Sequence, residues 1–416
     1  MDINKAPADP VVKGITKNDI NTKEGKLDFS SLLYAQMIER SPVSFGNTER
    51  LIKALKKAAD GEDITVSFIG GSITQGAGAE PAVSECYAYK TLKGIKELFN
   101  GKDNIHLCKA GIGGTPSEFG VFRFERDVLR MGDPDVMIIE FAVNDDIDET
   151  KGEAYESLIR RVLNLKSEPA VILLFAVFID DFNLQDSYSL IGNHYSLPMV
   201  SVKDAVSPQF DDPENCFITR ERFFFDDYHP TNDGHTVMAD CLLNLIKKVK
   251  EGRTETEKNI TDFAKKPLLG NDFETGFIID KKDVFDNAVI DAGGFTATDT
   301  DLQMTEFDDS SLLLPVMPDN YMYDGSGNYG DFSIRLKCRI LVVMYKDTPD
   351  ESFTQAEVYL DDRFLRLLDP RENDWTHCNT KLLIHEKESR EHTVRISIPE
   401  EKRNLKFTIL GFGAVK

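Results

Sequence analysis

The stretch ITVSFIGGSITQG, residues 64–76, decides how the chain is interpreted. The apolar run over residues 64–69 has the length and composition of a buried β-strand, and it leads Ser72 into a glycine-rich turn. The flanking glycines permit backbone angles that other residues disfavour and leave room for a substrate to approach the hydroxyl. Ser72 is therefore a candidate nucleophile, although a plain strand-to-helix turn whose serine caps the next helix would have the same sequence.

The composition is that of a globular protein with more than one domain. At 416 residues the chain exceeds what one hydrophobic core usually serves. Its 41% hydrophobic and 29% charged residues are globular values. The net charge of -22 repels phosphate backbones and anionic membrane surfaces, so we expect neither nucleic acid nor a membrane as a partner.

The N-terminus and the cysteines favour a cytoplasmic protein without a cofactor. Residues 1–7 lack the basic-then-apolar pattern of a secretory signal, although a secreted protein whose leader had been removed would look the same. The six cysteines are scattered without a Cys-x-x-Cys pair, which argues against a zinc knuckle or a redox dithiol. We expect free, buried thiols and no metal.

Residues 46–255 alternate between helical and strand-like segments. Besides the strand at 64–69, strands are predicted near residues 105–108, 136–143, 171–179 and 199–202. Helices are predicted near residues 47–59, 87–99, 118–131, 153–166 and 234–249. Strand runs such as residues 136–139 and 171–175 are continuously apolar, which is typical of a sheet covered by helices on both faces. We predict an α/β domain with a doubly wound, flavodoxin-like parallel sheet.

The rest of the chain divides into three parts. Residues 1–45 are predicted to be an N-terminal extension that packs on the α/β domain, and residues 256–270 a polar linker. Residues 271–416 contain short β-like runs separated by Gly, Asp, Asn and Pro. They predict an all-β sandwich.

Three loops that follow predicted strands carry groups suited to acyl transfer. The carboxyl ends of strands in an open parallel sheet converge on one crevice. Ser72 follows the first strand, a glycine-rich loop with Gly113 and Gly114 follows the second, and Asn144 follows the third. Acyl transfer needs a nucleophile and several donors for the oxyanion of its tetrahedral intermediate, and these loops could supply them.

The segment Asp226-Asp227-Tyr228-His229-Pro230 could supply the base. An aspartate three residues before a histidine on a tight loop can accept the Nδ1 proton and leave Nε2 to deprotonate Ser72. We assign this role to Asp226, with Asp227 as the alternative.

Taken together, these residues resemble the SGNH, or GDSL-type, hydrolase superfamily over about residues 64–246. Ser72 matches the first-block nucleophile, Gly114 the second-block glycine, Asn144 the third-block asparagine, and His229 with Asp226 the last-block Asp-x-x-His-Pro. The resemblance implies a two-step ester hydrolysis that needs no metal. In it His229 activates Ser72, and the Ser72 N–H, the Gly114 N–H and the Asn144 side chain hold the oxyanion.

Three departures from the family pattern indicate a divergent branch. Gly71 stands in place of the usual aspartate of Gly-Asp-Ser, Ala142 in place of the usual glycine of Gly-x-Asn-Asp, and Lys109 in place of an asparagine before the second-block glycines. None of them removes a catalytic group. Gly113 stays an alternative to Gly114 as the oxyanion donor.

The second domain and two acidic stretches complete the interpretation. A β-sandwich appended to such a hydrolase resembles two-domain bacterial carbohydrate acetyl esterases, whose accessory domain is similar to carbohydrate-binding modules. The candidate sugar contacts are aromatic residues, with burial in the sandwich core as the alternative: Trp375, Tyr321, Tyr323 and Tyr329. The acidic residues within 145–149 and 299–309 are predicted to be solvated loops, with a structural calcium as the alternative for the second.

These features predict a serine esterase that removes O-acetyl groups from oligo- or polysaccharides such as acetylated xylan or mannan. A polar, aromatic-bearing second domain and the lack of a long apolar lid favour a short acyl group on a sugar over a lipid chain. The alternatives are a lysophospholipase or thioesterase of the same superfamily, and a carbohydrate-binding protein with an inactive hydrolase domain. No pattern specifies the oligomeric state.

Overall fold

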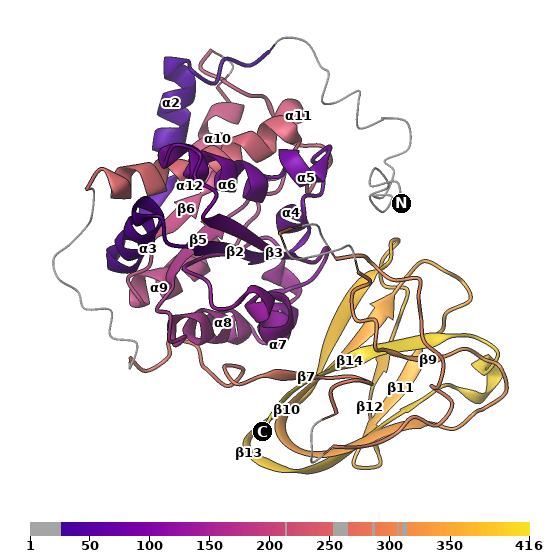
Figure 1. Ribbon diagram of the computed structural model, residues 1–416. Helices are drawn as coiled ribbons and strands as arrows, with labels where there is room; N and C mark the ends of the chain where they lie inside the picture. The colour runs from indigo at the N-terminus through magenta and orange to yellow at the C-terminus, as the bar shows by residue number, and fades with distance from the viewer. Residues whose placement is uncertain (1–25, 213, 253–264, 285–287, 306–307, 310–313) are drawn as a thin grey trace. The chain divides into compact units, whose positions relative to one another are not determined.

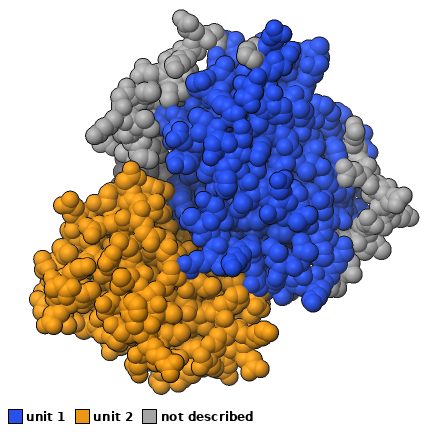
Figure 2. Space-filling model, turned by 180° about the vertical axis from the view of Figure 1, so that it is seen from behind, with its two compact units in different colours: residues 1–117, 126–271, 306–312 blue, residues 118–125, 272–305, 313–416 orange. Residues whose placement is uncertain are grey.

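The computed structural model describes residues 26–212, 214–252, 265–284, 288–305, 308–309 and 314–416. The chain divides into two compact units, which Figure 2 colours separately. The first unit comprises residues 1–117, 126–271 and 306–312, and the second comprises residues 118–125, 272–305 and 313–416. The predicted N-terminal extension up to residue 25 and the predicted linker over 256–264 lie outside the described residues. No helix in the described ranges has the length and apolar character needed to span a membrane.

The first unit contains a six-stranded sheet in the order β1-β6-β5-β4-β2-β3. Its parallel strands are β2 (Ile64–Gly70), β3 (Ile105–Gly111), β4 (Val136–Glu140), β5 (Ala170–Phe175) and β6 (Met199–Ser201). Read from the β3 edge, the parallel strands follow the order β3-β2-β4-β5-β6. If β2 is counted as the first strand, this is the order 2-1-3-4-5 of a flavodoxin-like sheet, so the predicted fold class is confirmed. Strand β1 (Pro42–Ser44) was not predicted and pairs antiparallel with β6 at the edge.

Helices cover both faces of this sheet (Figure 1). Helices α3 (Glu49–Asp60), α6 (Tyr87–Leu98) and α12 (Asn232–Lys250) pack on one face, where their apolar residues form a core with Val66 and Phe68 of β2. Helices α8 (Glu153–Leu163) and α9 (Gln185–His194) lie on the opposite face. The remaining helices are α2 (Leu32–Glu39), α4 (Ser72–Gln75), α5 (Ala82–Glu85), α7 (Ser117–Asp127), α10 (Val202–Phe210) and α11 (Arg220–Phe223).

The second unit is all-antiparallel, as predicted for this part of the chain. Its strands are β7 (Phe277–Ile279), β8 (Val289–Asp291), β9 (Tyr321–Tyr323), β10 (Phe332–Asp347), β11 (Ala356–Leu360), β12 (Arg363–Leu368), β13 (His377–Ser397) and β14 (Phe407–Val415). The first part of β10 pairs with β8 and its later part with β14. Apolar residues that alternate along these strands form a separate core.

Candidate active site

The nucleophile turn lies where the strand order of the first sheet reverses. Strand β2 ends at Gly70 and the short helix α4 begins at Ser72, whose side chain is partly exposed. Strand β4, the neighbour of β2, leads directly into the loop that carries Asn144. Ligands of open α/β sheets bind in the crevice at such a switch point, so Ser72 and Asn144 flank the expected ligand position.

The structure brings Ser72, His229 and Asp226 into one hydrogen-bonded row. His229 Nε2 lies 2.9 Å from Ser72 Oγ, and His229 Nδ1 lies 2.8 Å from Asp226 Oδ2. Asp226 Oδ1 accepts hydrogen bonds from the Tyr228 and His229 N–H groups, each at 2.8 Å. The Asp227 side chain is exposed, and its carbonyl accepts a hydrogen bond from the Ile179 N–H. Asp226 is thus the residue that orients His229.

The electrostatics of this loop favour an ionised Asp226. Burial opposes ionisation, but the hydrogen bond and charge of His229, with the Tyr228 and His229 N–H groups, hold the pKa of Asp226 below its ordinary value. A carboxylate in this position can stabilise an imidazolium at His229.

Asn144 packs against the residue that precedes the nucleophile. A Cβ added at Gly71 would lie 2.4 Å from Asn144 Oδ1 and 2.6 Å from Asn144 Nδ2, so a side chain at Gly71 would overlap the amide. This contact explains why glycine suits the position where the family usually has aspartate. Asn144 Oδ1 is buried and has no hydrogen-bond partner among the described residues.

The two glycines of the second loop differ in what holds them. The Gly113 N–H donates to Gln75 Oε1 at 2.8 Å, so the protein itself engages this group. Gly114 has a φ of +70°, in the left-handed region that glycine tolerates. Lys109 is buried, and its Nζ donates to the Gln75 carbonyl at 3.2 Å. Lys109 thus supports the same glutamine that holds Gly113, and Gly114 becomes the better candidate for an oxyanion donor.

Glu140, the last residue of β4, packs against the nucleophile turn. It is fully buried, and its Oε2 accepts a hydrogen bond from Thr74 Oγ1 at 3.0 Å. Burial raises the pKa of Glu140 to about 8, against the lowering effect of hydrogen bonds from the Thr74 hydroxyl and from the Thr74 and Gly71 N–H groups. Sequence reasoning missed this residue. Its only signal is one acidic residue at the end of an otherwise apolar run.

Asp145 links two loops of the site, and its burial corrects part of the prediction of a solvated acidic run, in which Asp146 is exposed as predicted. Asp145 accepts a hydrogen bond from the Ser117 N–H at 2.7 Å and another from the Tyr188 hydroxyl at 2.5 Å. Asp148 is also buried, and its carboxylate accepts hydrogen bonds from the Thr150 hydroxyl and N–H and from the Gly152 N–H. Burial raises the pKa of Asp145 to about 7.

The four aromatic residues proposed as sugar contacts fall into two groups. Tyr321 and Tyr323 belong to the core of the second unit, so their assignment as sugar contacts is wrong: their rings are not available for stacking. Tyr329 is 50% exposed and lies beneath the Arg403 guanidinium. Trp375 is partly exposed and stacks on the His377 ring at a centroid distance of 4.5 Å. Tyr329 and Trp375 stay predictions.

The second acidic stretch is not one carboxylate cluster. Asp299 and Asp301 each lie 3.2 Å from the buried Lys346 Nζ. Asp308 and Asp309, which belong to the first unit, instead accept hydrogen bonds from N–H groups of strand β3. The Lys346 ammonium group therefore pairs with Asp299 and Asp301, the residues for which a structural calcium is the alternative prediction.

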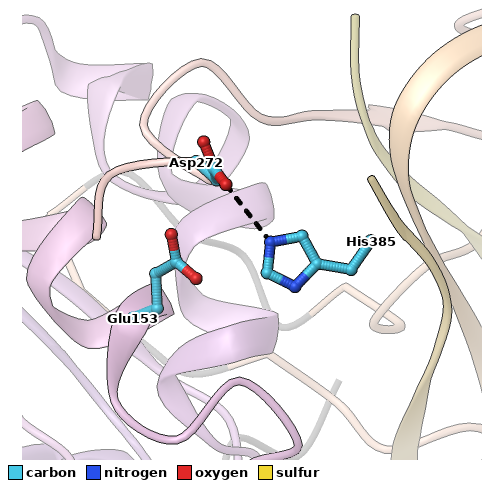
Figure 3. A group of neighbouring side chains, drawn as sticks. All are labelled: Glu153, Asp272 and His385. Atoms are coloured by element: carbon cyan, nitrogen blue, oxygen red, sulfur yellow. Dashed lines mark hydrogen bonds and ion pairs between the residues drawn. The ribbon is translucent and has the colours of Figure 1, made fainter. Parts of the chain in front are cut away.

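Ion pairs also engage the carboxylate of Asp272 in the second unit. Arg339 Nη1 lies 2.6 Å from Asp272 Oδ1. Figure 3 shows the other contact, in which His385 Nε2 lies 3.3 Å from Asp272 Oδ2. All six cysteines are free, and Cys216 alone among them is partly exposed.

The geometry and a family match define the class of the first unit. Residues 68–237 match the GDSL-like Lipase/Acylhydrolase family, and this segment contains the whole row of Ser72, His229 and Asp226. The first unit therefore contains a segment similar to GDSL-like hydrolases, and the enzyme class is that of carboxylic ester hydrolases.

The two-domain organisation is shared with a solved esterase. The chain is similar to a two-domain esterase (CEX) active on acetylated mannans, with 29% identity and a TM-score of 0.77 over 91% of this chain and 99% of that one. A structure of a two-domain esterase (CEX) active on acetylated mannans, co-crystallised with mannopentaose, has 29% identity and a TM-score of 0.75 over 91% and 98%. No curated protein matched the chain in sequence.

Proposed function

We propose that this protein is a serine esterase that removes O-acetyl groups from oligosaccharides, with acetylated mannan fragments as its first candidate substrate. The observation that carries the proposal is the hydrogen-bonded row Ser72–His229–Asp226 in a chain similar along 91% of its length to an esterase active on acetylated mannans. Acetylated xylan fragments are the second candidate.

In the first step Ser72 Oγ attacks the acetyl carbonyl carbon. Its proton passes to His229 Nε2, which is already within hydrogen-bond distance at 2.9 Å. Asp226 holds the imidazole with Nδ1–H toward the carboxylate and stabilises the imidazolium that forms. The lowered pKa of Asp226 keeps this carboxylate charged.

The negative charge that develops on the carbonyl oxygen needs hydrogen-bond donors. We assign this role to the N–H groups of Ser72 and Gly114 and to the side-chain amide of Asn144. His229 then protonates the sugar oxygen, which leaves as an alcohol. Water attacks the acetyl-serine with His229 as the base, and acetate is released.

Acetate release from acetylated oligosaccharides tests this proposal. We expect the wild-type protein, but not Ser72→Ala, to release acetate from acetylated mannan oligosaccharides and to convert them to lighter species in a mass spectrum. Faster cleavage of long-chain acyl esters, with no acetate release from any sugar, would contradict the proposal and favour a lipid-directed hydrolase. Equal, slow hydrolysis of 4-nitrophenyl acetate by both proteins would favour a binding protein with an inactive hydrolase domain.

A further inference from the structure

Tyr228 is an exposed aromatic residue directly beside the catalytic histidine. Its side chain is 54% exposed, and in the described part of the first unit no other aromatic side chain is classed as exposed. Its ring centroid lies 6.2 Å from that of His229, with an angle of 68° between the rings. The exposed ring beside the reactive centre offers apolar surface and one hydroxyl group, the combination with which tyrosine contacts ligands.

The neighbours of Tyr228 hold its ring in place. Phe178 packs edge-to-face against it at a centroid distance of 5.0 Å, and Phe182 stacks on Phe178 at 6.0 Å. The Phe178 N–H donates to the Phe182 carbonyl at 3.1 Å, which closes the loop that carries both rings. The pair of aromatic residues behind Tyr228 is therefore held in one arrangement.

Hydrogen bonds fix the backbone on both sides of this contact. Arg220 Nη1 donates to the Ile179 carbonyl at 2.6 Å, and the Ile179 N–H donates to the Asp227 carbonyl at 3.0 Å. The Tyr228 N–H donates to Asp226 Oδ1 at 2.8 Å. The exposed ring is thus ordered in advance, and a ligand that covers it loses little conformational entropy in binding.

We propose that Tyr228, backed by Phe178, is the platform on which the acetylated sugar ring lies while its ester is at Ser72. This inference rests on the proposed function. The acetyl group offers little surface to bind, whereas a pyranose has an apolar C–H face that suits the electron-rich face of an aromatic ring. The ester is attached to a hydroxyl group of the sugar, so a carbonyl at Ser72 brings the sugar ring close to His229 and its neighbour Tyr228.

Two substrates and two variants test the platform. Relative to wild type, Tyr228→Ala should lower kcat/KM for an acetylated mannan oligosaccharide about 3- to 10-fold, mainly through a higher KM. It should leave kcat/KM for 4-nitrophenyl acetate, which lacks a sugar, within about twofold. Tyr228→Phe keeps the ring and should retain the oligosaccharide activity. Leu190→Ala, which removes a 61% exposed apolar side chain from helix α9 of the first unit, serves as the matched control.

Different results identify different failures. An equal loss on both substrates would mean that Tyr228 only supports the His229 loop, and no loss on the oligosaccharide would mean that the ring does not bind sugar. Either result overturns the platform alone. A wild-type protein that cleaves 4-nitrophenyl acetate but no acetylated oligosaccharide overturns the proposed function, and the platform with it.

Discussion

A histidine hydrogen-bonded to an aspartate occurs in both units, but in different surroundings. In the first unit, His229 uses Nδ1 for Asp226 and Nε2 for Ser72, at 2.8 and 2.9 Å. In the second unit, His385 Nε2 lies 3.3 Å from Asp272 (Figure 3). Asp272 also pairs with Arg339 at 2.6 Å. A His–Asp contact therefore does not define a catalytic site; the partner of the second ring nitrogen does.

The two aspartates also differ in how they are fixed. Asp226 comes three residues before His229, and its side chain is 15% exposed with two backbone N–H groups bound to it. Asp272 is distant in sequence from His385, and its side chain is 41% exposed. Exposed ion pairs contribute little to stability, about 0–1 kcal/mol, whereas a fixed carboxylate can hold a histidine in one tautomer. The loop over residues 226–229 therefore fixes Asp226 beside His229, whereas Asp272 and His385 come from distant parts of the sequence.

Replacing each histidine by alanine should separate the pairs most strongly. His229→Ala removes the only base placed on Ser72 in the described structure, and we expect kcat on 4-nitrophenyl acetate to fall about 10⁴-fold or more. His385→Ala should stay within about twofold of wild type, because among the described residues no hydrogen bond joins this pair to Ser72, His229 or Asp226. Comparable losses in the two variants would break the comparison, provided that circular dichroism shows both to be folded.

The aspartates offer the next test. Asp226→Asn should lower kcat by about 10²- to 10⁴-fold, because an amide no longer stabilises the imidazolium and can select the wrong tautomer. Asp272→Asn should leave kcat unchanged and shift the free energy of unfolding by no more than about 1 kcal/mol. Steady-state kinetics and urea unfolding measure the two effects. An unimpaired Asp226→Asn variant would show that His229 is oriented by something else, with Asp227 as the first residue to examine.

Removing a single oxyanion donor should have a smaller effect. Asn144→Ala is expected to lower kcat about 10²- to 10³-fold with little change in KM, because the amide interacts with charge that develops only in the transition state. Asn215→Ala removes an exposed side-chain amide to which no role is assigned, and it is the control. A rise in KM at constant kcat would instead place Asn144 in ground-state substrate binding.

The buried Glu140 should make the stability of the first unit depend on pH. Its pKa is raised to about 8, whereas an unfolded glutamate titrates near about 4.3. Between these values the folded state keeps a proton that the unfolded state has released, so the free energy of unfolding falls as pH rises from about 5 to 8. Glu140→Gln should flatten this fall by roughly 1–3 kcal/mol.

Hydrogen exchange of β2 and β4 peptides can follow this pH dependence in the first unit. Fluorescence of Trp375, the only tryptophan, reports on the second unit as an internal reference. Exposed Glu62→Gln is the matched control and should behave as wild type. An identical pH dependence in wild type and Glu140→Gln would show that Glu140 does not hold the extra proton.

The fold of the first unit could be predicted because each strand carries its own signal. The runs at residues 136–139 and 171–175 are apolar on both faces, as buried parallel strands require. Strand β1 has only three residues and exists through its pairing with β6, where Pro42 lies opposite Val200. No local pattern contains that pairing.

The proposed catalytic residues could be picked out because each follows a strand or sits at a fixed offset from another. The burial of Glu140 and Asp145 depends on which helices and loops pack over them, which the sequence does not state.

Tyr321 and Tyr323 show why the sugar contacts could not be predicted in the same way. They are two residues apart on β9, so both rings lie on the face that points into the core. The sequence Tyr-Met-Tyr is apolar on both faces and does not indicate which face is buried.

Covalent labelling with a fluorophosphonate, mapped by peptide mass spectrometry, tests most directly whether Ser72 is the nucleophile that His229 activates. The account predicts a single adduct on Ser72 in wild type and in His385→Ala, and a greatly slowed reaction in His229→Ala. An adduct on another residue, or none in a preparation that hydrolyses 4-nitrophenyl acetate, would contradict it.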